Sequence, residues 1–363
     1  MMKEHIIKRC SLLREEMKKS GADAFVILTE EDTNWESLFY MSGFRGTSGA
    51  LLLYRDDEAE LILDGRYAAQ GREQSPHRTA EQRGDLVGEL REKLKKHGAA
   101  RILCEAEKTY HKSWQKLSDG LGSWEDGGEI IRRLRRRKDA GEIAEIRKAA
   151  DIGAKAFLEA LESVRPGMTE KEFAALLNYR IAASGGESGF DMIVASGPRG
   201  ALPHGRATDK EIGRGEAVTV DYGARWNGYF CDITRNFSIG EPDGEILERH
   251  ALITEAHRAG AASLRAGASG AAAHGEAVKI FAAEGLEKYF THSLGHGLGL
   301  EIHESPLLSP RRDDILREGD VVTIEPGLYI EGKGGMRLED DYLISAEGAE
   351  RLTKSLNQRF YIA

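Results

Sequence analysis

The segment VTVDYGARWNGYFCDITRNFSI, residues 218–239, predicts a β-hairpin that carries two acidic side chains. Two β-rich runs flank Asn227-Gly228, a dipeptide typical of two-residue turns between antiparallel strands. With the turn at these residues, Asp221 lies opposite Thr234, and Asp232 is its diagonal neighbour on the same face. Two carboxylates so close repel each other unless a cation or a proton intervenes. The alternative is that both aspartates face solvent beside the turn.

A histidine cluster follows in HSLGHGLGLEIHES, residues 292–305, which contains His292, His296 and His303 among glycines. Histidine is the commonest neutral metal ligand and carries protons near neutral pH, and glycines let other groups approach closely. His296, between two glycines, is the best ligand candidate of the three. The alternative is that these are hydrogen-bonded structural histidines. His204, within LPHG, is expected in a loop.

Two further glutamates belong to apolar segments near the C-terminal end. Glu325 lies in VVTIEPGLYI, and a buried glutamate needs a partner or a metal. Glu339 lies in GMRLEDDYLIS, where Arg337 precedes it on the same strand face. An ordinary surface pair between Arg337 and Glu339 is the alternative. Four carboxylates and one imidazole form a hard, oxygen-rich set that favours two ions of manganese, cobalt or zinc over a thiolate-type zinc site.

Taken together, these segments resemble the pita-bread-fold metallopeptidases, specifically the Xaa-Pro aminopeptidases and their relatives the Xaa-Pro dipeptidases, or prolidases. The resemblance covers nearly the whole chain and implies hydrolysis of the bond between an N-terminal residue and a following proline. It implies two divalent ions, most simply Mn²⁺, with Co²⁺ or Zn²⁺ as alternatives. The implied ligands are Asp221, Asp232, His296, Glu325 and Glu339, of which Asp232 and Glu339 bridge the two ions.

The same resemblance implies roles for the remaining candidates. His303 matches the residue that contacts the substrate carbonyl and the tetrahedral intermediate, while His292 and His204 match histidines that line the substrate site. Glu325 would take the proton of the nucleophile and pass it toward the leaving proline nitrogen. Arg337 matches an arginine beside the metal shell. The sequence departs from the family pattern at Asn236 and at Cys231, neither of which is a ligand position.

Substrate length separates the two subfamilies. The segments YMSGFRGTSGALLL (40–53) and LDGRYAAQ (63–70) resemble the aminopeptidase side. A strict dipeptidase must pair the free proline carboxylate, usually with a basic group, because burying it unpaired is costly. Arg45, Arg66 and Arg199 are the unplaced candidates for that group. A strict dipeptidase, and a non-catalytic peptide-binding module on the same fold, therefore remain alternatives.

The order of expected elements predicts an α/β (α+β) chain of two domains. Residues 1–138 are expected to form a small creatinase-like α/β domain around a mixed sheet, and residues 139–363 a pita-bread catalytic domain with a curved antiparallel sheet. Strands are expected at 24–28, 50–54 and 60–63, and helices at 4–20, 85–96, 142–163, 170–184, 244–265 and 270–288. The basic run at 132–138 reads as an exposed linker and helix start, with an RNA-binding patch as the alternative.

Composition limits the partners and the compartment. The chain has 363 residues, a formal net charge of −9 and a pI near 5.8, which argues against a nucleic-acid partner. Cys10, Cys104 and Cys231 are widely spaced and odd in number, so a reducing cytoplasm is expected. No apolar run reaches the roughly 18 residues that a membrane span needs, so no membrane partner is expected. Peptides with proline in second position and a second copy of the chain, as a homodimer, are the expected partners.

Overall fold

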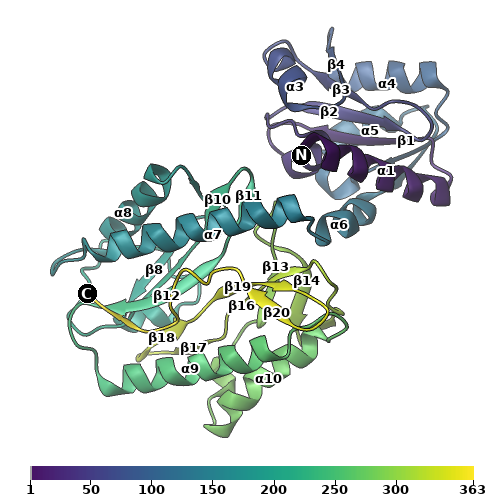
Figure 1. The fold of residues 1–363 in the computed structure, drawn as a ribbon. Coiled ribbons are helices and arrows are strands. Elements are labelled where there is room, and N and C mark those ends of the chain that lie inside the picture. Colours follow the sequence, from purple (N-terminus) through teal and green to yellow (C-terminus); the bar gives the residue numbers. More distant parts are fainter. Residues whose placement is uncertain (1) are drawn as a thin grey trace. The chain divides into compact units, whose positions relative to one another are not determined.

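Two compact units make up the chain, one that ends at Arg135 and one that runs Arg136–Ala363. A computed structural model describes residues 2–363 and defines the fold of each unit by itself (Figure 1). Both units combine helices with sheets, which confirms the predicted α/β (α+β) class. Within the described residues, no helix combines the length and the apolar character needed to cross a membrane.

The first unit is built around one six-stranded sheet. Its strands are β1 (Ala24–Thr29), β2 (Gly49–Tyr54), β3 (Glu60–Leu63), β4 (Arg78–Glu81), β5 (Arg101–Cys104) and β6 (Ser123–Asp126). Its helices are α1 (Met2–Ser20), α2 (Trp35–Ser42), α3 (Ala68–Gln74), α4 (Leu86–His97), the 3₁₀ turn η1 (Ala106–Lys108), α5 (His111–Ser118) and α6 (Gly128–Arg136).

The strand order β4-β3-β2-β1-β5-β6 makes this a mixed sheet, as predicted. β1 pairs with β2 in antiparallel fashion and with β5 in parallel fashion. Every residue of β1, β2 and β3 is buried, so these strands are covered on both faces. Such strands read as continuous apolar runs, which is why the sequence located them well.

The second unit contains four long helices and short strands. The helices are α7 (Ala140–Leu161), α8 (Glu170–Ala183), α9 (Gly244–Ala262) and α10 (Gly270–Ala283), with 3₁₀ turns η2 (Gly197–Ala201) and η3 (Glu287–Tyr289). The first strands are β7 (Glu187–Ser188), β8 (Ile193–Ser196), β9 (Val218–Tyr222), β10 (Ala224–Trp226), β11 (Tyr229–Phe230) and β12 (Ile233–Ser238). The later ones are β13 (Gly295–Gly297), β14 (Glu304–Ser309), β15 (Arg312–Asp313), β16 (Val321–Ile324), β17 (Gly327–Ile330), β18 (Gly334–Arg337), β19 (Asp340–Ile344), β20 (Ala349–Arg351) and β21 (Tyr361–Ile362).

Two halves compose this unit, and each has its own core. Strands in the order β21-β12-β9-β8 share a buried apolar cluster with α7 and α8, centred on Phe157, Phe173 and Tyr222. Strands in the order β15-β14-β13-β16-β19-β20 share a second cluster with α9 and α10, which includes Phe281 and Val322. Figure 1 shows the two helix pairs on opposite sides of the strands. The strands of the two halves therefore meet in the middle of the unit, where an isolated bridge joins Thr234 to Glu339.

Local sequence signals explain where the first two helices of this unit begin. α7 starts after Asp139, whose side chain accepts bonds from the backbone N–H groups of Gly141 and Glu142. The Glu142 side chain in turn accepts the N–H of Asp139, which completes a capping box. α8 starts in the same way after Thr169. Both boxes satisfy donors that a helix N-terminus leaves unpaired.

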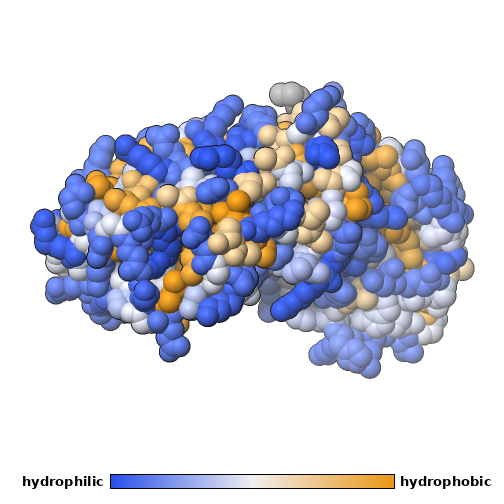
Figure 2. Space-filling model, turned by 90° about the horizontal axis from the view of Figure 1, so that it is seen from below, coloured by the Kyte–Doolittle hydropathy of each residue, from blue (hydrophilic) through white to orange (hydrophobic). Residues whose placement is uncertain are grey.

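The basic run at 132–138 is only in part the exposed linker that the sequence predicted, because Arg132, Arg133 and Arg137 are exposed but other members are not. α6 extends to Arg136, and Arg135 and Lys138 are each only 4% exposed. Lys138 pairs with Glu304, and Arg136 pairs with the fully buried Asp320. The prediction failed for Arg136 and Lys138 because their carboxylate partners come from segments far along the chain. The face of the molecule drawn in Figure 2 carries many hydrophilic side chains, with apolar ones gathered in patches between them.

Candidate metal centre

All five predicted ligands lie at or near strand ends around one cavity of about 870 Å³. The predicted register is confirmed, because Asp221 pairs with Thr234 across β9 and β12, and residues 227 and 228 form the turn. Asp232 comes one residue before β12, and Glu339 one residue before β19. The two strands that carry these carboxylates belong to different halves of the unit. The cavity therefore opens where the halves meet.

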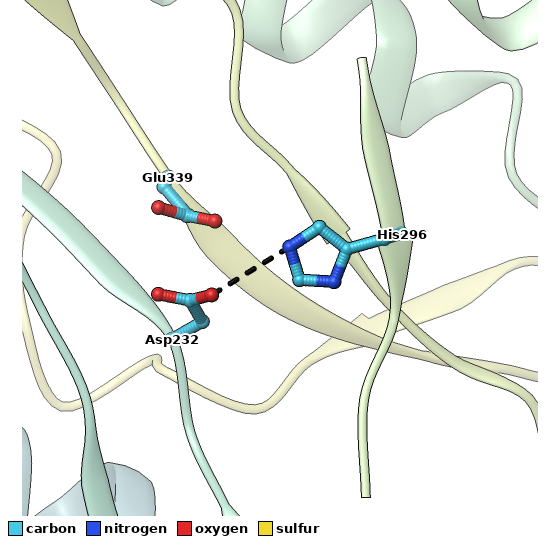
Figure 3. Close-up of side chains that lie close together, drawn as sticks. All are labelled: Asp232, His296 and Glu339. Carbon is cyan, nitrogen blue, oxygen red and sulfur yellow. Dashed lines mark ion pairs between the residues drawn. The ribbon is translucent and has the colours of Figure 1, made fainter. Parts of the chain in front are cut away.

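Three of the five side chains converge closely. Ligand atoms of Asp232, His296 and Glu339 all lie within 4.8 Å of one another, and all three residues are buried (Figure 3). The His296 Nε2 atom is 3.6 Å from Asp232 Oδ2 and 3.5 Å from Glu325 Oε1. Glu325, directly after β16, thus also lies beside His296. These separations leave space for an ion rather than a direct hydrogen bond.

The environment of His296 fixes which ring nitrogen can bind a metal. Its Nδ1 atom lies 3.0 Å from the carbonyl oxygen of Gly297, which can only accept a hydrogen bond. Nδ1 therefore carries the proton, and Nε2 presents its lone pair toward Asp232 and Glu325. Burial, with His303 as a second cause, lowers the pKa of His296 to about 4, so the ring is neutral at pH 7. A neutral imidazole oriented in this way is a suitable metal ligand.

Arg337 holds Asp221, the fifth predicted ligand. The Nη2 atom donates to Asp221 Oδ2 at 2.5 Å, and Nη1 donates to the Tyr329 hydroxyl at 2.7 Å. The Nε atom donates to Thr234 Oγ1 at 3.2 Å. The predicted position of Arg337 beside the carboxylates is thus what the structure shows. The alternative of a surface pair with Glu339 is wrong in its location, because both residues are buried. Arg337 Nε lies 4.0 Å from Glu339 Oε2, while its shortest hydrogen bond goes to Asp221.

The carboxylates carry more negative charge than Arg337 can balance. Burial is the largest cause that raises the pKa of Asp221, Asp232 and Glu339. Neighbouring carboxylates raise the pKa of Asp232 and Glu339 further. Burial likewise raises the pKa of Glu325 to about 8. The Oδ1 atoms of Asp221 and Asp232 are buried and accept no hydrogen bond from the described residues. Oxygen donors that are crowded, buried and partly unpartnered fit divalent cations.

Two side chains outside the predicted set hold the converging carboxylates in place. Thr234 donates its hydroxyl to Glu339 Oε2 at 2.7 Å. Asp232 lies just before β12, and its backbone N–H donates to the buried Asp341 side chain (Oδ2) at 3.1 Å. Asn236, where the family pattern often has another residue, donates to the Arg337 carbonyl at 2.7 Å. The sequence offered no signal for these bonds, because they join strands about a hundred residues apart.

The other predicted site residues also surround the cavity. His292 has a partner on each ring nitrogen, the Ser293 carbonyl at 2.8 Å and the Tyr329 hydroxyl at 2.9 Å. Its pKa falls to about 3, chiefly through burial and next through Arg337. The exposed His303 stacks edge-on against His296 with ring centroids 4.4 Å apart, and burial lowers its pKa. His204 is exposed and lines the same cavity.

Tyr329 and Arg206 are lining or supporting residues that the sequence did not reveal. Tyr329 connects Arg337 to His292 through its hydroxyl, and its place four residues after Glu325 on a hairpin was the one available signal. Arg206 lines the cavity and pairs with Asp191 at 2.9 Å. Arg199, one of the arginines considered for a carboxylate clamp, instead bonds the buried Glu170. Arg45 and Arg66 belong to the first unit.

A two-half α/β unit with a buried set of carboxylates and a histidine at its centre defines a metal-dependent hydrolase. Residues 144–346 match the metallopeptidase family M24, and residues 9–137 match the creatinase/prolidase N-terminal domain. The chain belongs to metallopeptidase family M24, which implies divalent metal ions. The predicted pita-bread fold is confirmed by the same match.

Several relatives resemble the chain along most of its length. It is 36% identical to the Xaa-Pro dipeptidase of Pyrococcus furiosus over 88% of this chain and 91% of that protein. The crystal structure of an X-Pro aminopeptidase from Thermotoga maritima superposes with a TM-score of 0.92 at 37% identity, covering 96% of this chain and all of that one. A Xaa-Pro dipeptidase from Bacillus anthracis superposes equally well, with a TM-score of 0.92 at 35% identity, covering 98% and 99% of the two chains.

Proposed function

We propose that this protein is a dinuclear, metal-dependent Xaa-Pro aminopeptidase that releases an N-terminal residue from peptides with proline in second position. The relatives named as proline peptidases, of both length classes, support the proline specificity. The five donor side chains around one cavity support the two-metal part of the proposal. Mn²⁺ is the expected ion because the donor set is hard and mostly oxygen.

The positively charged side chains of the cavity are the reason for proposing an aminopeptidase and not a dipeptidase. Within the described cavity lining, the arginines are Arg206 and Arg337. Arg337 already donates to Asp221, Tyr329, Thr234 and the Pro203 carbonyl. The Arg206 side chain is 78% exposed and pairs with a similarly exposed Asp191. A free proline carboxylate would therefore find the buried Arg337 already hydrogen-bonded and Arg206 exposed, which favours substrates whose chain continues beyond proline.

The chain's own residues supply the remaining chemistry. Bound ions would act as Lewis acids and lower the pKa of a water molecule. Glu325, which reaches the group beside His296, accepts the proton of the attacking water and returns it toward the proline nitrogen. His303, at the cavity surface, donates a hydrogen bond to the carbonyl oxygen as negative charge develops there. Arg337 keeps Asp221 oriented, and the Tyr329 hydroxyl links Arg337 to His292.

Substrate length tests the proposal directly. Initial rates are measured with Mn²⁺ on Ala-Pro, Ala-Pro-Ala and longer Ala-Pro peptides, and again with Co²⁺ and Zn²⁺. We expect kcat/KM for the tripeptide to equal or exceed that for the dipeptide. Turnover of the dipeptide alone would make the protein a strict dipeptidase. Arg206 would then be the candidate clamp, and Arg206→Ala would raise the KM for Ala-Pro.

We also propose a homodimer that works in the cytoplasm. The three cysteines are free and buried, and burial raises the pKa of Cys10 and Cys104 to about 12, which keeps them as unreactive thiols. This state suits a reducing compartment. Size-exclusion chromatography with light scattering measures the mass in solution, and a mass equal to one chain of 40.0 kDa would exclude the dimer.

A further inference from the structure

A buried ion pair lies beside the metal centre but uses none of its ligands. The Lys138 Nζ atom is 3.1 Å from Glu304 Oε2, and the two side chains are 1% and 7% exposed. Lys138 belongs to the basic run that joins α6 to α7, and Glu304 opens β14 directly after His303. Desolvating two charges is costly unless further hydrogen bonds compensate. We therefore expect this ion pair to hold a backbone segment in place.

The second oxygen of Glu304 closes the loop that carries His303. Glu304 Oε1 accepts the backbone N–H groups of Leu300 and Glu301, each at 3.1 Å. These residues belong to the short connection between β13, which carries His296, and β14. Lys138 occupies the other oxygen and so fixes which side of the carboxylate faces the loop. Bonds to an ionised carboxylate are about twice as strong as neutral ones.

Gly299 shows that the loop is built around this pair. A Cβ atom at Gly299 would lie 2.9 Å from Lys138 Cε and 3.0 Å from Glu304 Oε2, closer than real Cβ contacts. The glycine therefore leaves the space that the ends of the Lys138 and Glu304 side chains fill. The Gly299 carbonyl also accepts the N–H of Phe230 at 2.9 Å. The loop is thereby fastened to the hairpin that leads into Asp232.

We propose that Lys138 and Glu304 form a positioning pair that sets the direction of the His303 imidazole. The inference rests on the role of His303 under the proposed function. His303 is the residue directly before Glu304, so a shift of the carboxylate moves the His303 backbone. A misplacement of about 1 Å can cost a reaction roughly a hundredfold in rate. Lys138 and Glu304 do not line the cavity and are not among the proposed ligands, so they act through His303.

A double-mutant cycle with His303 tests the pair. Lys138→Met keeps the length of the side chain and removes its charge. In the wild-type background we expect it to lower kcat on Ala-Pro-Ala by about a hundredfold, with little change in KM and with unchanged metal content. In the His303→Ala background we expect Lys138→Met to have almost no further effect on kcat. Residues that act through one another are non-additive in this way.

A second variant and a control guard against a simple folding defect. Lys138→Met/Glu304→Gln removes both charges, so no buried carboxylate is left unpaired, and its melting temperature should exceed that of Lys138→Met. We expect it still to lose at least about tenfold in kcat, because a neutral amide holds the loop more weakly. The control is Arg136→Met on the same segment. Arg136 pairs with Asp320 at 2.7 Å and not with Glu304, so kcat should stay unchanged.

The outcomes separate the inference from the proposed function. If His303→Ala alone leaves kcat unchanged, the role of His303 in the proposed function is wrong. If His303→Ala lowers kcat but Lys138→Met lowers it equally in both backgrounds, the positioning pair is overturned. Full kcat in the folded Lys138→Met/Glu304→Gln variant would overturn it as well. A loss that appears only in the wild-type background supports it.

Discussion

Side chains in the metal centre have one of two roles. Some are proposed to bind the ions, and others fix the orientation of the ligands. Glu339 illustrates the first role, because one of its oxygens accepts the Thr234 hydroxyl and its carboxylate lies within reach of Asp232 and His296. Arg337 illustrates the second, because each of its nitrogens serves a different partner. The two residues lie on one short segment, which ties binding and support to the same piece of backbone.

Loss of Glu339 should affect both ions at once. It comes from the half opposite to Asp232, and the two carboxylates are the proposed bridges. Glu339→Ala is therefore expected to lower the occupancy of both sites in protein purified with excess Mn²⁺, measured by elemental analysis. Glu350→Ala, which changes an exposed glutamate paired with Arg147, is the control and should keep the wild-type content. Full occupancy of both metal sites in Glu339→Ala would show that Glu339 is not a metal ligand.

Replacement of Arg337 by lysine should weaken metal binding although the charge is kept. A lysine ammonium cannot reach Asp221, Tyr329 and Thr234 together as the planar guanidinium does. Groups that orient metal ligands typically contribute 10- to 100-fold in affinity, so Mn²⁺ affinity should fall by about that factor in calorimetric titrations. Arg147→Lys, at an exposed bidentate pair with Glu350, should leave the affinity unchanged. Equal affinities for both variants would contradict the role of Arg337.

At the scale of strands, glycines beside the ligands permit close approach of backbones. An added Cβ at Gly295 would lie 2.0 Å from the Thr323 carbonyl oxygen, which belongs to the neighbouring β16. This contact involves backbone on both sides, so neither strand can move without moving His296. The glycines that made the histidine cluster conspicuous in the sequence thus have a structural reason.

Gly295→Ala should therefore destabilise the fold by at least about 1–3 kcal/mol, as overpacked cores do. Gly275 in α10 is the matched control, because an added Cβ there meets nothing within 4 Å. Gly275→Ala should instead stabilise by about 0.5–1 kcal/mol, through the higher helix propensity of alanine. Urea unfolding of the metal-free variants measures both changes. Equal stability of the two variants would show that the strands can separate at Gly295.

Elements defined by local chemistry could be predicted from the sequence, and contacts between distant segments could not. The Asn227-Gly228 turn fixed the register that makes Asp221 and Asp232 neighbours, and the structure has that register. The burial of Lys138 was not foreseen, because its partner Glu304 lies 166 residues away. Thr234 and Asp341 were missed for the same reason. A basic run or a lone threonine has no local signature until the fold supplies its partner.

At the scale of the whole molecule, the centre makes stability depend on metal and on pH together. Without ions, the folded state favours the protonated forms of the central carboxylates, because burial raises the pKa of each of them. Ions replace these protons when they bind. Metal ions and protons therefore compete for the same carboxylate oxygens. The stability of the fold depends on which of the two is bound.

The metal-free protein should therefore lose stability as the pH rises from 6.5 to 8.5. Glu325 sets the window, since its pKa is raised from 4.5 to about 8. A group with a raised folded-state pKa contributes stability that is complete below its unfolded pKa and is lost as the pH passes the folded one. The melting temperature of chelator-treated protein should fall across this range, and Glu325→Gln should flatten the decline.

Added Mn²⁺ should reverse the trend. Binding to the folded state alone raises the melting temperature, and the increment should grow with pH because fewer protons must be displaced. Scanning calorimetry with and without Mn²⁺ at 6.5, 7.5 and 8.5 measures the increment directly. A metal-free melting temperature that rises over this range would mean that the carboxylates are already ionised in the folded protein, and that a cation of the chain itself balances them.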